Sequence, residues 1–332
     1  MDDKKKKSAI ELQFNDTLVG RSENVCDNYT ASLSSLQEEI TTKFVGKKLQ
    51  TETLGAVYSI LDLEKRSSRV FDRGSFLEFK VTQDNAKLQH ANFCKDRLCP
   101  MCNWRRSKKI FSQASAVMDY MGDYQFLFLT LTVKNCSAQD LPKTVQVLFD
   151  GWRYLYNKNK IFKSVIEGTF RSLEVTRNAD DGSFHPHLHC ILAVRPSYFK
   201  KGYLTQKKWS ELWRNACDLD YNPIVDIRKF KDRGKGIASA VSEATKYAVK
   251  GSDFLNDWDL VESAEITRSL LDALSGRRRC SWTGVFARIR KKLQLDDVEN
   301  GDLVHTDDDY VREDVAYMIV RYSWKSGIYN ML

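Results

Sequence analysis

The sequence has no run approaching the roughly 18 apolar residues that a membrane-spanning helix requires. Lysines occupy positions 4 to 7, but no apolar segment follows them that could act as an export signal. We therefore expect a protein without a membrane partner and with a cytoplasmic location.

Cysteine is present, but not in the pattern of a disulfide framework. Eight cysteines occur in a chain without an export signal, a setting in which thiols stay reduced. Five of them are scattered, whereas Cys94, Cys99 and Cys102 fall within nine positions. Such crowding is typical of metal ligands.

Acidic residues do not balance basic ones, and the net charge is +8. This charge suits a polyanionic partner such as DNA, although any single basic cluster can equally be a solvated surface. Basic clusters lie close to the chemical motifs described below. The residues in them that we expect to contact DNA are Arg105, Arg106, Lys108, Lys109, Arg277, Arg278 and Arg279.

Strand-like and helix-like patterns are mixed along the chain, which indicates an α+β fold with a central antiparallel sheet flanked by helices. Strands are expected near 74–81, 126–133, 168–176 and 186–194, and helices near 104–121, 141–156, 204–218 and 237–250. We expect a flexible tail (1–40) with a marginal helix near 32–44, an N-terminal region with a cysteine knuckle (41–112) and a catalytic core (113–255). A mainly helical C-terminal region (256–332) would serve origin recognition or formation of a homodimer.

Three of the five histidines lie in the segment His185-Pro-His-Leu-His189. Residues two apart on a strand project from the same face, so His187 and His189 point together. If the preceding hairpin turns near residue 180, Glu174 lies opposite His187 on the partner strand. Two imidazoles and a carboxylate could then bind one divalent ion, Mn²⁺ or Mg²⁺. A slip of one residue would turn Glu174 away.

A tyrosine with charged neighbours follows in the expected helix 237–250. Glu243, Tyr247 and Lys250 are four and three residues apart and would share one helix face. Tyrosine, with a pKa of about 10, becomes an effective nucleophile when a metal polarises its target and a cation lies nearby. An exposed helix with an ordinary side-chain contact is the alternative reading of these residues alone.

The cysteine cluster offers up to four zinc ligands, because His90 precedes Cys94, Cys99 and Cys102. The spacing of Cys99 and Cys102 is that of a standard half-site for tetrahedral zinc. A reduced turn without metal is the alternative. A zinc-pinned loop would also present its neighbouring cations to phosphates.

Taken in order, these segments resemble the replication initiators of small rolling-circle plasmids, in the HUH endonuclease superfamily. The cysteine knuckle 94–102, the strand Phe128-Leu-Thr-Leu-Thr132, the histidine motif and Glu243-x3-Tyr247-x2-Lys250 carry the resemblance. It continues through Trp282-Thr-Gly-Val-Phe286 and covers roughly residues 75 to 295.

The resemblance implies the fold, a ferredoxin-like antiparallel palm, and the chemistry. His187 and His189 match the paired metal ligands, with Glu174 as a third, and Tyr247 matches the nucleophile that leaves a 5′-phosphotyrosine and a free 3′-hydroxyl. Glu243 would activate water at termination, while Lys250 belongs to the same motif. The implied partners are plasmid origin DNA, exposed as a single strand or hairpin beside flanking duplex, and a host helicase and DNA polymerase in the bacterial cytoplasm.

Three other functions are alternatives to this one. A histidine-triad nucleotide hydrolase would use a histidine nucleophile, but Pro186, the cysteine knuckle and the basic charge suit it poorly. A transposase or relaxase of the same superfamily would share the chemistry. A DNA-binding regulator that retains the fold without catalysis is the third.

Overall fold

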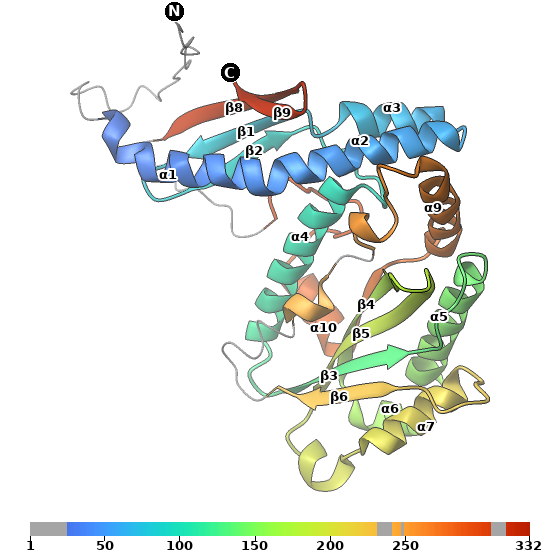
Figure 1. The fold of residues 1–332 in the computed structure, drawn as a ribbon. Coiled ribbons are helices and arrows are strands. Elements are labelled where there is room, and N and C mark those ends of the chain that lie inside the picture. The colour runs from blue at the N-terminus through green and yellow to red at the C-terminus, as the bar shows by residue number, and fades with distance from the viewer. Residues whose placement is uncertain (1–24, 231–240, 247–248, 307–316) are drawn as a thin grey trace, which may run out of the picture. The chain divides into compact units, whose positions relative to one another are not determined.

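The computed structural model describes residues 25–230, 241–246, 249–306 and 317–332 (Figure 1). The chain divides into a terminal unit, Met1–Arg105 with Asp302–Leu332, and a central unit, Arg106–Gly301. Each unit contains an antiparallel sheet with helices against it, which confirms the predicted α+β class. No helix in the described ranges has the length and apolar character needed to cross a bilayer.

The terminal unit is built on a four-stranded sheet with the order β2-β1-β8-β9. Its strands are β1 (Phe76–Val81), β2 (Ala86–Ala91), β8 (Met318–Lys325) and β9 (Ile328–Met331). Before them come α1 (Val25–Glu39), the short π-helix η2 (Ile40–Phe44), α2 (Val45–Ile60) and α3 (Glu64–Asp72). Phe44 packs edge-on against both Phe79 of β1 and Tyr329 of β9, so the helical segment covers the sheet.

The two ends of the chain differ from the predicted domains. Helix α1 begins at Val25, and Leu36 and Ile40 are buried, so the expected flexible tail 1–40 is helical over its second part. The C-terminal region carries the helices α9 (Leu260–Leu274) and α10 (Gly284–Lys292), and it also supplies the strands β7 (Cys280–Thr283), β8 and β9. Strand β8 pairs with β1, from which it is separated by more than 200 residues, and a local pattern cannot reveal such a pairing.

The central unit contains a five-stranded antiparallel sheet with the order β6-β3-β5-β4-β7. Its strands are β3 (Gln125–Thr132), β4 (Gly168–Arg177), β5 (Phe184–Val194), β6 (Val225–Lys229) and β7 (Cys280–Thr283). The helical segments are α5 (Leu141–Asn157), α6 (Lys160–Val165), η3 (Tyr198–Gly202), α7 (Gln206–Ala216), η4 (Gly251–Asp253), α9 (Leu260–Leu274) and α10 (Gly284–Lys292). Helix α4 (Pro100–Asp119) contributes residues to both units.

Both faces of this sheet are covered, as the apolar run of β3 predicts. On one face, Phe170 and Ile191 form a cluster with Val117 of α4 and Phe286 of α10. On the other, Arg171 lies over the ring of Phe149 of α5, at 4.4 Å. Strand β7 and helix α10 extend the unit beyond residue 255, where the predicted catalytic core ended.

The helix predicted over 237–250 is present only in part among the described residues. Residues 241–244 are helical, whereas 245–246 form a turn and Lys250 has an extended backbone. The hydroxyl of Ser172 donates to the carbonyl of Ala244, a carbonyl that a continuing helix would use for its own hydrogen bond. Glu243 and Lys250 therefore do not share one helix face.

Candidate metal centre and its surroundings

The β4–β5 hairpin sets the register of the histidine motif. Between the strands, the amide of Asn178 donates to Ser183 and that of Gly182 to Asn178. Gly182 has φ +69°, a conformation that favours glycine. With this turn fixed, Glu174 pairs directly with His187, as the sequence predicted.

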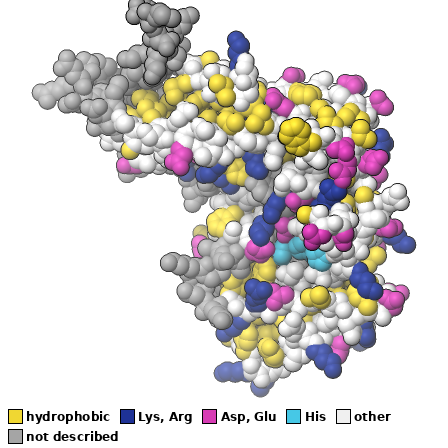
Figure 2. Space-filling model, viewed as in Figure 1, with side chains coloured by type: hydrophobic (Ala, Val, Ile, Leu, Met, Phe, Trp, Pro, Cys, Tyr) yellow, Lys and Arg dark blue, Asp and Glu magenta, His cyan; other side chains and the backbone are white. Residues whose placement is uncertain are grey.

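Glu174, His187 and His189 bring their ligand atoms together on one face of the sheet. Glu174 Oε2 lies 3.2 Å from His187 Nε2 and 2.8 Å from His189 Nε2, and the two Nε2 atoms are 3.1 Å apart. About 3 Å is the edge of an octahedron whose metal–ligand bonds are about 2.1 Å long. All three side chains are buried, and histidine can be seen at the surface of this face in Figure 2. The residues fit a divalent ion.

The outer contacts of both imidazoles leave Nε2 for a metal. With a metal bound at Nε2, His187 would donate from Nδ1 to the carbonyl oxygen of His185, which lies 2.9 Å away. His189 Nδ1 lies 3.2 Å from the hydroxyl of Thr130 on β3. The ring of His189 also stacks on Phe128, with centroids 5.5 Å apart. Sequence reasoning did not identify Thr130 in this role, because a threonine on a strand carries no distinctive signal.

The carboxyl of Glu174 is held ionised by its neighbours. Burial alone would raise the pKa of this carboxyl, but the hydrogen bonds from His187 and His189 and their charges outweigh burial. The pKa of Glu174 therefore lies well below its usual range. An ionised carboxylate is the form that binds a divalent cation.

Glu243 lies beside this triad, held there by the segment 241–246. Its Oε1 is 3.9 Å from His189 Nε2, and its Oε2 is 2.5 Å from Lys246 Nζ. The neighbouring Ala244 is buried and accepts a hydrogen bond from Ser172, which pairs with His189 across the strands. The side chain of Glu243 is 41% exposed, so water can reach it.

The nucleophile expected from the motif, Tyr247, lies outside the described residues. Lys250 is exposed, and its carbonyl accepts a hydrogen bond from the amide of Asp253. Sequence reasoning missed Asp253. Burial raises the pKa of Asp253, and the negative charge of Glu174 adds to the rise, although Lys250 opposes it. Asp253 therefore belongs to the electrostatic surroundings of the triad.

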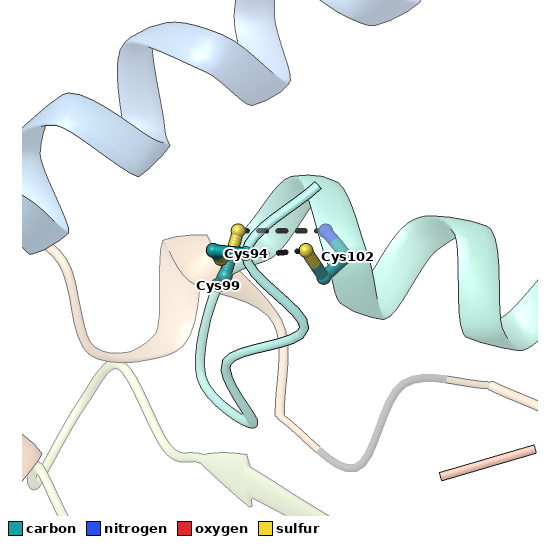
Figure 3. Close-up of side chains that lie close together, drawn as sticks. All are labelled: Cys94, Cys99 and Cys102. Carbon is teal, nitrogen blue, oxygen red and sulfur yellow. Dashed lines mark hydrogen bonds between the residues drawn. The ribbon is translucent and has the colours of Figure 1, made fainter. Parts of the chain in front are cut away.

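The second cluster of candidate ligands lies in the terminal unit, where the loop before α4 brings Cys94 and Cys99 to Cys102 (Figure 3). The sulfurs of Cys94 and Cys102 are 3.5 Å apart. Tetrahedral zinc with bonds of about 2.3 Å holds its sulfurs about 3.8 Å apart. The amides of Asp96 and Cys102 donate to the sulfurs of Cys94 and Cys99, which favours thiolates. The donor set fits zinc.

These hydrogen bonds affect the three thiols unequally. Burial raises the pKa of the Cys99 thiol, but hydrogen bonds that it accepts from Cys102, Cys94 and Thr51 outweigh burial. The pKa of Cys99 therefore lies well below its ordinary value. Burial raises the pKa of Cys102. One sulfur is thus already disposed to be a thiolate, the form that binds metal.

His90, the predicted fourth ligand, is not part of this cluster. It lies on β2, where it pairs with Glu78 of β1, and its Nε2 is 3.7 Å from Glu78 Oε1. The side chain is 74% exposed. The structure thus places His90 beside Glu78 and, contrary to the prediction, does not bring it together with the three cysteines. No fourth histidine, cysteine or acidic atom joins the three sulfurs within the described ranges.

Most of the arginines and lysines assigned to DNA contacts have structural partners instead. Arg105 donates to the carbonyls of Leu303 and Val304, and Arg106 to that of Glu299. The side chains that are buried, contrary to the prediction, are those of Arg105, Arg106, Lys109 and Arg279. Lys109 pairs with Asp296, Arg279 pairs with Glu299, and Arg277 binds Gln146 and the carbonyl of Ala273. Lys108 is partly exposed, and Arg278 is 69% exposed.

Comparison with known proteins bears on both units. Residues 85–330 match the family described as "Replication protein". The chain is 39% identical over 273 residues to "Protein rep" of Streptococcus pneumoniae, covering 80% of this chain and 83% of the relative. It is 36% identical over 322 residues to "Protein rep" of Bacillus amyloliquefaciens, covering 86% and 92%. A "Replication protein" of Staphylococcus aureus is 37% identical over 212 residues, covering 62% and 89%. No solved structure gives a significant match.

Proposed function

The chain belongs to the replication protein family, and we propose that it initiates plasmid replication by nicking one DNA strand with a metal-assisted tyrosine. The observation that carries the proposal is the convergence of Glu174, His187 and His189 on one point, with Glu243 next to it. A triad of this kind needs a divalent ion, Mn²⁺ or Mg²⁺, to be chemically useful.

The chemistry divides between the ion and the residues around it. A bound ion would polarise the scissile phosphate and stabilise the charge that develops on it. The hydroxyl of Tyr247 attacks phosphorus, the bond from phosphorus to the 3′ oxygen breaks, and that oxygen takes up a proton. One DNA end then carries a 5′-phosphotyrosine, while the other is a 3′-hydroxyl that a host DNA polymerase can extend. A host helicase would separate the strands ahead of it.

Glu243 has the position expected of the base that ends the cycle. Its carboxylate lies at the edge of the triad and remains partly exposed, so it can accept a proton from water. The water oxygen bonds to phosphorus, the bond from phosphorus to the tyrosine oxygen breaks, and the phenol recovers a proton. Hydrolysis of this kind would release the protein from DNA after one round.

The three-cysteine cluster is proposed to hold a structural zinc ion. Its sulfurs are buried and receive backbone hydrogen bonds, as sulfurs at structural sites do. An ion here would fix the start of α4, since Cys99 precedes this helix and Cys102 lies in its first turn. Its role is in stability rather than in cleavage.

The test of the nicking proposal is cleavage of a single-stranded DNA pool of random sequence, labelled at the 5′ end. We expect Mn²⁺-dependent fragments with extendable 3′-hydroxyl ends. His187→Ala and His189→Ala should each lower the cleavage rate by at least roughly 100-fold, more than the loss of an outer-shell partner does. The matched control is His305→Ala, because this histidine is half exposed, pairs with Asp302 and is not part of the triad. Metal-independent cleavage, or full activity of His187→Ala, would refute the proposal.

A further inference from the structure

A pocket of about 480 Å³ lies in the central unit between strand β7 and helix α10. The proposed nicking reaction assigns it no role. Its volume is within the range of roughly 300–1,000 Å³ that holds small ligands or single groups of a larger one. Its lining comes from Arg278, from both elements and from the segment just after α10.

Three cations line this pocket: Arg278, Arg290 and Lys291. Arg290 and Lys291 belong to the basic last turn of α10. Lys291 is exposed, and Arg278 is 69% exposed and only 3.7 Å from Asp297. Cations gathered around a concave site favour an anionic ligand. Phosphate is the anionic group of nucleic acids that arginine and lysine bind.

The rest of the wall includes the apolar surfaces of Trp282, Ala287 and Leu295. The indole nitrogen of Trp282 is buried and has no hydrogen-bond partner in the part of the chain that the structure describes. The guanidinium of Arg290 lies over the ring of Trp282, 5.6 Å from its centroid, and also donates to Gln113 and to the carbonyl of Asp296.

The pocket shares a face of the sheet with the metal triad. Trp282 pairs with Phe170 on β4, and their rings are 4.4 Å apart. Phe170 and Glu174 are four residues apart on the same strand, so their side chains project from the same face, about 13 Å apart. A DNA strand that reaches the triad could therefore also reach the pocket.

We propose that this pocket binds one unpaired nucleotide of the DNA strand that the protein cuts. The base would lie beside Ala287 and Leu295, and its phosphate against Arg278 and Lys291, next to Arg290. The nucleotide must be unpaired, because a duplex presents phosphates on a convex surface and keeps its bases stacked inside. The inference rests on the proposed function for its choice of DNA as the ligand.

The test is binding alone, measured by fluorescence anisotropy with the full-length chain in EDTA. The probes are a labelled single-stranded pool of random sequence, an abasic oligomer of the same length and a duplex. Wild type should bind the pool about tenfold more tightly than the abasic oligomer, as expected when one base is accommodated. Ala287→Phe fills the pocket without changing charge, and it should remove that preference while leaving duplex binding unchanged.

Lysines 291 and 292 provide the matched pair for the phosphate. Both are exposed and lie in the last turn of α10, but only Lys291 lines the pocket. Lys291→Ala should weaken binding of the pool and of the abasic oligomer about threefold, and Lys292→Ala should weaken it less. Equal losses of affinity in Lys291→Ala and Lys292→Ala would show that the two lysines act only through the general positive charge, and would overturn the inference. Equal affinity of wild type for the pool and for the abasic oligomer would also overturn it. An Ala287→Phe variant that keeps the preference for the pool over the abasic oligomer would overturn it as well. Failure of the nuclease proposal would appear separately, as absent cleavage with these binding differences intact.

Discussion

At the scale of single residues, the imidazoles and the carboxylates near the triad are arranged for different tasks. Glu174 is buried and kept ionised by two histidines, which suits a ligand. Glu243 is 3.9 Å from one of those histidines but remains 41% exposed, which suits a base for water. The difference between the two acids comes from their elements, since Glu174 lies on a central strand and Glu243 on a short helical segment over it.

Glu243→Gln should separate the two halves of the reaction. The amide cannot accept a proton from water, so the covalent product should form but be released at least roughly 100-fold more slowly. The measurement is the decay of labelled adduct after unlabelled DNA is added. Glu265→Gln, an exposed glutamate on α9, is the control. Release at the wild-type rate in Glu243→Gln would remove Glu243 from the mechanism.

The sequence predicted which candidate metal ligands lie together, but it misjudged the cations. The pairing of Glu174 with His187 could be predicted because side chains alternate on a strand and the turn composition fixed the hairpin centre. The burial of Arg105 and Arg106 could not, because their partners are backbone carbonyls almost 200 residues away. A cluster of positive charge looks the same in a sequence whether it faces solvent or anchors a distant loop.

At the scale of elements, the cysteine loop is anchored by one buried acid. Asp96 accepts hydrogen bonds from Tyr58 of α2 at 2.8 Å, from Arg66 of α3 at 2.8 Å and from the amide of Leu98 at 2.9 Å. Burial raises the pKa of Asp96, but Arg66 and these hydrogen bonds outweigh burial and bring the pKa below its ordinary value of 3.8. The acid therefore ties the cysteine loop to two helices.

Asp96→Asn should destabilise the terminal unit by roughly 3 kcal/mol, because it leaves Arg66 without its buried partner. Since the pKa is lower in the folded state, the stabilisation is complete above about pH 4 and is lost as the pH falls through the folded pKa. Urea denaturation at neutral and acidic pH would measure this, with the exposed Asp84→Asn as the control. The difference in the free energy of unfolding between wild type and Asp96→Asn should become smaller in acid. Equal free energies of unfolding for wild type and Asp96→Asn at neutral pH would contradict the anchoring role.

Cys99→Ser should remove zinc from the purified protein and lower the unfolding temperature of the terminal unit by more than about 5 °C. Metal analysis and calorimetry are the measurements. Cys136→Ser serves as the matched control, since Cys136 lies outside the cluster. Wild-type protein that carries no zinc after preparation in its presence would argue for a reduced, metal-free turn.

The expected helix over 237–250 shows where element prediction fails. The sequence favours a helix, but Ser172 binds the Ala244 carbonyl, and the described helix ends there. Tertiary contacts of this kind override local propensity. The same contact holds Glu243 at the triad, so the departure from the local pattern coincides with the site.

At the scale of the whole molecule, the family match extends through both units, from residue 85 to residue 330. Local periodicity predicted most strands of the central unit, but it did not predict that β8 and β9 complete the sheet of the terminal unit. Pairing between Phe76 and Ser323 joins residues that are distant in the sequence, and only the folded structure reveals it. The net charge of +8 suits a DNA partner at this scale too.

The central claim is that Tyr247 becomes covalently linked to DNA. The most direct measurement is to incubate wild type and Tyr247→Phe with Mn²⁺ and single-stranded DNA of random sequence that is labelled at its 3′ end. The products are then resolved on a denaturing gel. We predict a labelled protein band that requires metal and is absent in Tyr247→Phe. A covalent band that persists in Tyr247→Phe would contradict the account.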